Sequence, residues 1–138
     1  MSFHVCYYHV VWATKGRAEL ITPEVERIII PTIRRKSADL QSPIFAINGT
    51  IDHIHVAVSI ATAIAVARWV KEVKGVSAYT VNTTYPDLNP RFYWQKGYGV
   101  HTFGAKVLPF VTDYIEQQKE HHRDNTAEDY LEQCAADD

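Results

Sequence analysis

Apolar positions recur along the chain with two different periods, and each period predicts a type of secondary structure. Alternating or β-branched apolar stretches predict four strands, at residues 3–13, 44–51, 54–60 and 98–103. Apolar residues at helical spacing predict three helices, at residues 23–39, at residues 61–82, and from residue 106 past residue 118. Thr22 followed by Pro23 is typical of a helix start, with a capping hydroxyl before a first-turn proline.

The order of these elements predicts an α+β fold. A β-α-β-β-α-β order matches a ferredoxin-like or RRM-like antiparallel sheet with its helices on one face, to which a C-terminal helix is added. The 138 residues suit a single domain spanning residues 1–138. The hairpin between the second and third strands is expected to turn at Asn48-Gly49, with Asp52 as the less favoured position.

Charge is distributed unevenly along the chain. The net charge is only -2, but residues 119–138 hold seven acidic and two basic residues, so the preceding body is mildly basic. Residues 124–138 therefore form an acidic C-terminal tail, in which a short helix is expected near Tyr130. Because binding to DNA depends on neutralising phosphates, this body predicts moderate, salt-sensitive affinity.

Composition indicates a globular protein of the cytoplasm. Apolar residues make up 46% of the chain, and no apolar run approaches the ~18 residues that a membrane span requires. The start of the chain lacks the pattern of a signal peptide. Cys6 and Cys134 lack metal-type spacing, which is typical of thiols in a reducing compartment.

Two histidines mark the start of the third predicted strand. His53 and His55 are two residues apart, so both imidazoles point to the same face of a strand while Ile54 points to the other. Together they could bind one divalent cation. Asp52 could orient an imidazole by accepting its hydrogen bond and so support the cation, or it could simply be a turn residue. Histidines that alternate on a strand and bind nothing are an equally good interpretation of the pair.

Tyr114 and Gln118 lie in the last predicted helix. Their four-residue spacing places a phenol and a carboxamide on one helix face. Taken alone, Tyr114 is better explained as a core aromatic residue and Gln118 as a solvated helix residue. Combined with His53 and His55 on the third predicted strand, they would form a metal-assisted site for phosphodiester chemistry. Tyr114 would be its nucleophile and Gln118 its third metal ligand.

Basic and aromatic side chains offer further contacts for a nucleic acid. The candidate phosphate contacts are Lys15, Arg17, Arg34, Arg35, Lys71, Lys74, Arg91 and Lys96. Taken singly, each is better explained as an ordinary surface charge. Trp94 and Tyr98 could stack on unpaired bases, although packing in the core is the stronger interpretation.

The remaining histidines have simpler explanations. His121 and His122 are expected to be cations near the C-terminus of a helix, where they interact favourably with its dipole. His9 and His101 fall in predicted strands and are interpreted as core histidines with satisfied hydrogen bonds.

Five sequence blocks, in order, resemble the single-tyrosine HUH transposases of the insertion-sequence 200/605 type. The blocks are residues 8–15, 52–56, 73–77, 94–99 and 114–122. The resemblance implies that His53 and His55 are metal ligands, that Gln118 completes the metal site and that Tyr114 is the nucleophile. The implied cofactor is a divalent metal, Mg²⁺ or Mn²⁺.

The resemblance also implies a reaction and partners. Such enzymes cleave and rejoin single-stranded DNA at the ends of a mobile element through a 5′-phosphotyrosine, and they recognise imperfect hairpins there. They form homodimers, in several of which the tyrosine helix reaches the histidine pair of the other subunit. A domesticated hairpin-binding protein without transposition and a metal-dependent hydrolase remain the alternatives.

Overall fold

A four-stranded antiparallel sheet forms the centre of the computed structural model, which describes residues 6–135. Its strands are β1 (Tyr7–Ala13), β2 (Ile44–Gly49), β3 (His53–Val58) and β4 (Gly99–Phe103). They lie in the order β2-β3-β1-β4, and every neighbouring pair is antiparallel. This order is that of a ferredoxin-like sheet, as the sequence predicts.

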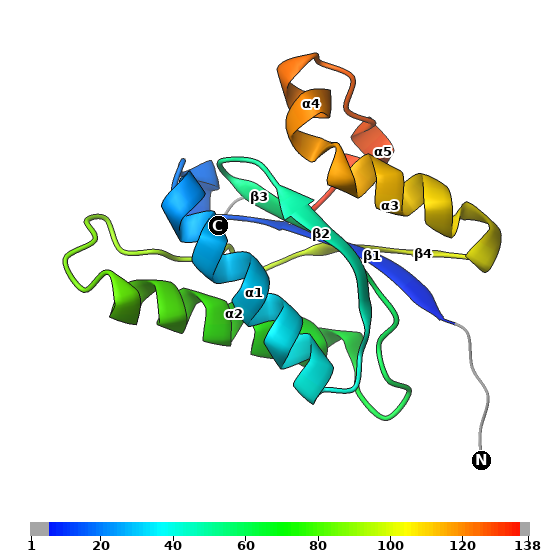
Figure 1. Cartoon of the computed structure of the whole chain (residues 1–138), viewed down its shortest axis with the longest axis horizontal. Helices are drawn as coiled ribbons and strands as arrows, with labels where there is room; N and C mark the ends of the chain where they lie inside the picture. The colour runs from blue at the N-terminus through cyan, green and yellow to red at the C-terminus, as the bar shows by residue number, and fades with distance from the viewer. Residues whose placement is uncertain (1–5, 136–138) are drawn as a thin grey trace.

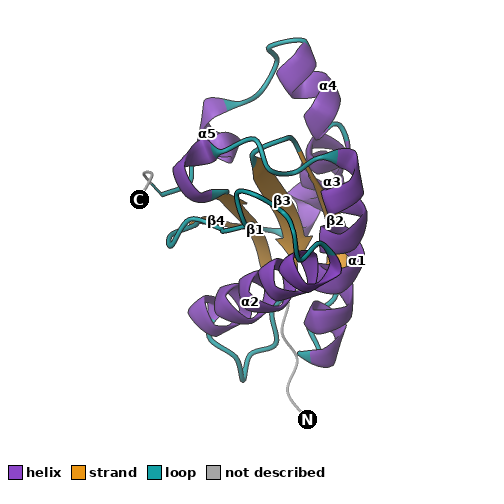
Figure 2. Ribbon diagram, turned by 90° about the vertical axis from the view of Figure 1, so that its left-hand side faces the viewer, coloured by secondary structure: helices purple, strands orange, loops and turns teal. Residues whose placement is uncertain are grey.

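Helices cover both faces of this sheet, in two groups (Figures 1 and 2). One face carries the two long helices, α1 (Pro23–Asp39) and α2 (Val66–Thr84). On the other side lie α3 (Leu108–Glu116), α4 (Gln118–Arg123) and α5 (Asp129–Glu132). Two short 3-10 helices, η1 (Lys15–Arg17) and η2 (Ala105–Val107), connect the larger elements. The two crossover helices thus share one face, as predicted, and the added C-terminal helices occupy the opposite one.

The main core lies between the sheet and the two long helices. Ile54, Val56 and Val58 of β3 point into it, where they meet Val10 and Trp12 of β1. The start of α1 is specified by local sequence, because the Thr22 hydroxyl accepts a hydrogen bond from the Val25 backbone N–H at 3.3 Å. Since the apolar residues of β3 face this core, the intervening histidines must face the other side of the sheet.

A short turn between β2 and β3 sets the position of β3, the strand that carries His53 and His55 and is called the histidine strand below. β2 ends at Gly49 and β3 begins at His53, so the hairpin turns at the position of Asp52 and not at Asn48-Gly49. Gly49 is required for a close approach: a Cβ at this position would lie 2.1 Å from the His53 carbonyl oxygen.

Several predicted boundaries differ from the structure. Of the first predicted strand, residues 3–5 lie outside the described residues, and the ladder begins at Tyr7, which pairs with the last residue of β4. The second long helix begins at Val66 and not at residue 61, because residues 61–64 form a turn closed by an Ile64 N–H to Ala61 carbonyl bond of 3.0 Å.

The last predicted helix is not continuous. Its backbone leaves helical values at Gln117 (φ -102, ψ 23), which divides α3 from α4. Tyr114 and Gln118 therefore lie on two successive helices and not on one.

A second, smaller core fixes α3 over the histidine strand. Val111 and Ile115 pack against Ala46 of β2 and Ala57 of β3. The Asn48 side-chain amide donates to the Glu116 carbonyl at 3.0 Å, so the end of α3 is tied to β2. The tyrosine helix thus docks on the histidine strand of its own chain.

Among residues 6–135, no helix combines the length and the apolar character that crossing a membrane demands.

Candidate functional site

The histidine pair lies buried on the sheet face covered by α3, and each ring has a defined partner. His53 Nδ1 lies 2.8 Å from Asp52 Oδ1 and 2.9 Å from the Thr50 hydroxyl. His55 Nδ1 lies 2.7 Å from His9 Nε2 on the neighbouring strand β1. These contacts fix both rings so that their Nε2 atoms point to the same side. Asp52 is therefore placed to orient His53, the role considered for it in the sequence.

Three side chains from α3 and α4 converge on the same place. Gln118 is fully buried, and its Oε1 lies 3.3 Å from His53 Nε2, so its interpretation as a solvated residue is wrong. Tyr114 is 3% exposed, and its ring stacks on His121 at 4.6 Å between centroids. The His122 ring lies edge-on to His53 at 4.7 Å between centroids. His122 thus faces the site and is not merely a cation at a helix end.

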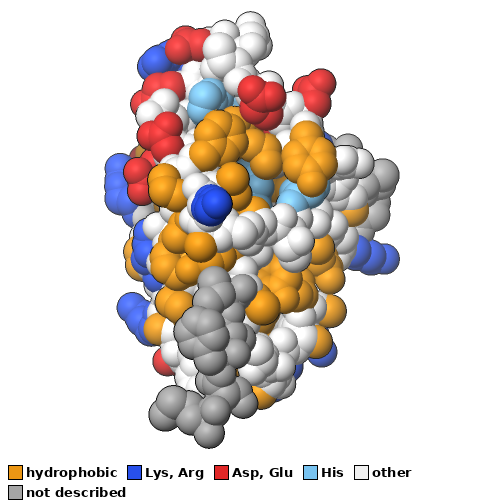
Figure 3. Space-filling view, turned by 90° about the vertical axis from the view of Figure 1, so that its right-hand side faces the viewer, with side chains coloured by type: hydrophobic (Ala, Val, Ile, Leu, Met, Phe, Trp, Pro, Cys, Tyr) orange, Lys and Arg blue, Asp and Glu red, His pale blue; other side chains and the backbone are white. Residues whose placement is uncertain are grey.

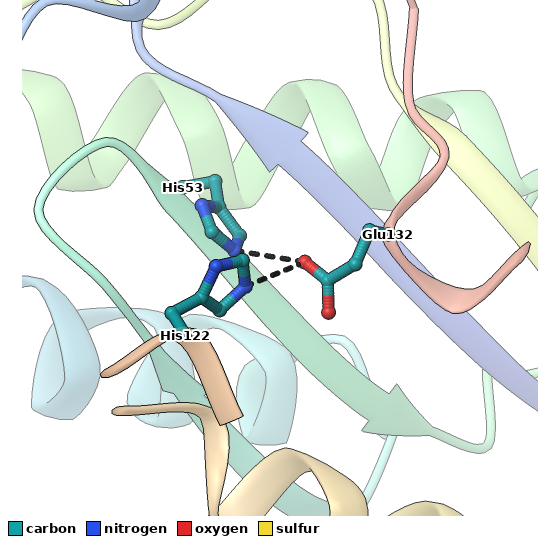
Figure 4. Close-up of side chains that lie close together, drawn as sticks. All are labelled: His53, His122 and Glu132. Atoms are coloured by element: carbon teal, nitrogen blue, oxygen red, sulfur yellow. Dashed lines mark hydrogen bonds and ion pairs between the residues drawn. The ribbon is translucent and has the colours of Figure 1, made fainter. Parts of the chain in front are cut away.

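A carboxylate from α5 occupies the centre of this cluster. Glu132 Oε1 lies 3.1 Å from His53 Nε2, 3.0 Å from His55 Nε2 and 2.9 Å from His122 Nε2. Figure 4 shows His53 and His122 converging on this oxygen from β3 and α4. The ligand atoms of His53, His122 and Glu132 all lie within 4.8 Å of one another, a spacing that could hold a metal ion.

The second carboxylate oxygen contacts the tyrosine. Glu132 Oε2 accepts hydrogen bonds from the Tyr114 hydroxyl and from Gln118 Nε2, the latter at 3.1 Å. The Tyr114 oxygen also accepts the Glu128 backbone N–H at 2.8 Å. One carboxylate group therefore touches the imidazoles, the amide and the phenol together.

These contacts set the protonation of the site. Burial by itself lowers the pKa of His53, but hydrogen bonds to Asp52 and Glu132 raise it to about 9. Burial lowers the pKa of His55 to about 4 despite its hydrogen bond to Glu132. Burial would raise the pKa of Glu132, but hydrogen bonds from His53 and His55 hold it well below its usual range. His53 is thus an imidazolium between two carboxylates, and His55 is neutral.

His9 and His55 form a hydrogen-bonded chain that ends on the Glu132 carboxylate. Burial and the nearby His55 lower the pKa of His9 to about 3, so His9 is neutral too. Since His55 donates from Nε2 to the Glu132 carboxylate, its Nδ1 accepts, and His9 donates from Nε2. His9 Nδ1 is buried and has no hydrogen-bond partner within the described residues. His9 is therefore not a satisfied core histidine; it orients His55.

An apolar hollow of about 430 Å³ opens beside the site. His9 and His101 lie in its wall with Phe110 and Tyr130. Figure 3 shows this face, on which apolar side chains surround exposed histidine atoms and acidic side chains lie above them. The hollow thus reaches His9, which contacts His55.

Only some of the predicted phosphate contacts lie together. Lys71 and Lys96 line a groove along α2 with the aromatic residues Trp94 and Tyr98. Lys74 lines the same groove, but its Nζ donates to the Gln95 and Gly97 carbonyls at 2.7 and 2.8 Å. Lys74 thus has a structural role, since it ties α2 to the segment before β4.

The other predicted contacts are dispersed. Lys15 and Arg17 lie in η1, where Arg17 Nη1 approaches Asp52 Oδ1 to 3.8 Å beside the histidine strand. Arg34 and Arg35 are exposed on α1, and Arg91 is exposed in the loop before β4. None of these five residues lines the groove along α2.

Three residues of the site, His9, His122 and Glu132, have no part in the chemistry that the sequence predicts. His122 follows Gln118 by four residues, so helical spacing could have indicated it. His9 shares a strand face with Val11, which pairs with His55, and alternation could have suggested its side. Glu132 has no local signal, because it comes from the acidic tail and joins His55 across 77 residues of sequence.

Comparisons with known proteins find relatives that match most of the chain. The family model described as "Transposase IS200 like" matches residues 2–118. The ISDra2 transposase TnpA of Deinococcus radiodurans is 26% identical over 115 residues, which cover 80% of this chain and 82% of the relative. The transposase of insertion sequence element IS200 from Salmonella typhimurium is 28% identical over 119 residues, covering 83% and 78%.

Two solved structures share the fold. A crystal structure of a Deinococcus radiodurans R1 protein superposes with a TM-score of 0.69 at 24% identity, covering 86% of this chain and 95% of the other. A REP-associated tyrosine transposase bound to a REP hairpin superposes with a TM-score of 0.63 at 17% identity, covering 88% and 74%. At these identities the likeness concerns the fold alone. Because the family model spans most of its sequence, the chain belongs to the IS200-like family of transposases.

Proposed function

We propose that this transposase cleaves and rejoins single-stranded DNA with Tyr114 as nucleophile and a divalent cation on His53, His55 and Gln118. One observation carries the proposal: a single carboxylate, that of Glu132, contacts the Tyr114 hydroxyl with one oxygen and both imidazoles with the other. An anionic group can therefore lie between the nucleophile and the metal-binding side chains. A scissile phosphate needs this position.

The donor set fits a divalent cation such as Mg²⁺ or Mn²⁺. The Nε2 atoms of His53 and His55 point to one oxygen position, and the Gln118 amide oxygen lies 3.3 Å from the first of them. Bound there, the cation would polarise the phosphate and offset developing negative charge. Asp52 would accept a hydrogen bond from His53 Nδ1 and so hold the ring with its Nε2 toward the cation.

Tyr114 would perform the bond exchange. Its oxygen attacks the phosphorus, a 5′-phosphotyrosine forms and a 3′-hydroxyl leaves. Since one phosphodiester replaces another, rejoining to a different 3′-hydroxyl needs no external energy source. Burial and the hydrogen bond to Glu132 raise the pKa of Tyr114 well above its ordinary value, so the phenol requires nearby positive charge to ionise.

The partner would be a DNA hairpin at the end of a mobile element. A REP hairpin is bound by one protein of the same fold. The groove along α2, with Lys71, Lys96 and Trp94, combines charges for phosphates with an aromatic ring for bases. A homodimer would supply two tyrosines, since one chain has one Tyr114 and joining two element ends requires two cleavages.

The test is a covalent adduct assay with the full chain. A hairpin oligonucleotide with a single-stranded flank is incubated with Mn²⁺, and the adduct is separated on a denaturing gel. Tyr114→Phe removes only the hydroxyl and should abolish the adduct while hairpin binding persists. Tyr79→Phe, at a 69% exposed position on α2, is the matched control and should keep it. An adduct that forms equally with Tyr114→Phe would refute the assignment.

A further inference from the structure

The tail that delivers Glu132 is held against the sheet by specific features. A Cβ at Gly99 would lie 2.0 Å from the Gln133 carbonyl oxygen, and one at Gly97 would lie 2.3 Å from the Ala135 Cβ. The buried Gln95 amide also donates to the Ala135 carbonyl at 3.0 Å. Two glycines and a buried amide thus make room for the tail and bind it, so that α5 is placed over the site by the sheet itself.

The distances around Glu132 match those between neighbouring ligands of one cation. Its Oε1 lies 3.1, 3.0 and 2.9 Å from the Nε2 atoms of His53, His55 and His122. In an octahedral site with metal–ligand bonds of about 2.1 Å, adjacent ligand atoms are separated by about 3.0 Å. The Nε2 atoms of His53 and His122 and the Glu132 oxygen lie close enough to one another to bind the same ion.

We propose that His122 and Glu132 are additional metal ligands, which close the site before DNA binds and favour a transition metal over Mg²⁺. The inference rests on the proposed function in one respect, namely that His53 and His55 hold the cation. Imidazole nitrogens suit Mn²⁺, Co²⁺, Ni²⁺ and Zn²⁺, whereas Mg²⁺ prefers oxygen ligands and retains water. The substrate phosphate then replaces the Glu132 carboxylate when DNA enters.

The helix that carries His122 is positioned for this role. Gln118 and His122 are four residues apart on α4, so both side chains face the histidine strand. Lys119 of the same helix donates from Nζ to Glu26 at 2.9 Å and to Asn48 at 2.6 Å, which ties α4 to α1 and β2. His122 thus reaches the site from a helix that is anchored on both sides.

The experiment measures metal binding by the full chain without DNA. Metal-free protein is titrated with Co²⁺, and both the dissociation constant and the visible absorption bands of the bound ion are recorded. Glu132→Gln and His122→Gln should each weaken Co²⁺ binding by about 10-fold or more and shift the bands, because each removes a ligand. Glu128→Gln, at an exposed position in the same tail, is the matched control and should stay within about 2-fold of the original chain.

A second titration compares Mn²⁺ with Mg²⁺ by calorimetry. The original chain should bind Mn²⁺ at least about 10-fold more tightly than Mg²⁺, and this preference should shrink in His122→Gln, which loses a nitrogen donor. Equal preference in the two proteins would count against His122 as a ligand.

His53→Asn separates this inference from the proposed function. If His53→Asn loses Co²⁺ binding while Glu132→Gln and His122→Gln keep both affinity and spectrum, the additional ligands are refuted and the histidine site stands. If Glu132→Gln binds Co²⁺ more tightly, the carboxylate competes with the cation and the inference is likewise refuted. If His53→Asn binds as tightly as the original chain, both proposals fail.

Discussion

In the chain without metal, Glu132→Gln should lower the free energy of unfolding most at about pH 6 and least at about pH 9.5. The substitution keeps the shape of the side chain and removes its negative charge. That charge stabilises the His53 imidazolium, which donates to Glu132 Oε1 at 3.1 Å. Since His53 is protonated only below its folded-state pKa, the effect must depend on pH.

The magnitude follows from the pKa of His53. Its rise on folding from 6.5 to about 9 corresponds to about 3 kcal/mol of stability. Because the folded-state pKa is the higher one, this stability is fully present below pH 6.5 and is lost as the pH rises through 9. Asp52 and Glu132 both raise this pKa, and an equal division assigns about 1.5 kcal/mol to Glu132.

Urea unfolding with a chelator present, at both pH values, measures the difference between the variant and the original chain. Glu128→Gln removes one charge from the same tail at an exposed position and serves as the control. The part of the loss that comes from the His53 charge is expected to be about 1.5 kcal/mol at the lower pH and about a tenth of this at the higher pH. Weakened hydrogen bonds from Tyr114 and Gln118 add a loss that does not depend on pH. A loss that is equal at both pH values would refute the assignment of the charge to His53.

Three further predictions concern the histidine chain, the groove and the core. His9→Phe keeps an aromatic ring but leaves His55 Nδ1 without its partner, so Co²⁺ affinity should fall about 10-fold in a spectroscopic titration; unchanged affinity would exclude an orienting role. Lys71→Ala should reduce the salt dependence of hairpin binding by about one phosphate contact in fluorescence titrations, and an unchanged slope would remove this lysine from the interface. Ile54→Ala should lower the urea unfolding free energy by about 2–5 kcal/mol, because Ile54 is fully buried in the main core; a loss below about 1 kcal/mol would contradict the packing described.

The strands and long helices follow from local patterns. Alternation in β3 correctly separates Ile54 and Val56, which face the core, from His53 and His55, which face the site. Such patterns are reliable because side-chain direction repeats every two residues in a strand, whatever the rest of the chain does. The break at Gln117 escaped prediction, since no glycine or proline marks it and only the backbone angles change.

The side chains that α3 and α4 contribute to the site also follow from local sequence spacing. Tyr114, Gln118 and His122 follow one another at four-residue intervals, and the turn at Gln117 leaves all three directed at the histidine strand. These side chains contact β3 because α3 docks on the sheet face opposite the long helices. Val111 and Ile115 hold α3 there by packing against the sheet.

The central carboxylate depends on the tertiary structure alone. The sequence predicts only a short helix near Tyr130 in the acidic tail and gives it no place in the fold. In the structure, residues 128–135 return to the sheet and place Glu132 among the imidazoles. No local period carries this information, because the direction of the tail is set by the space above Gly97 and Gly99, about 35 residues earlier in the chain. The sequence thus specifies which side chains can perform the chemistry on each element, and long-range packing specifies which of them meet.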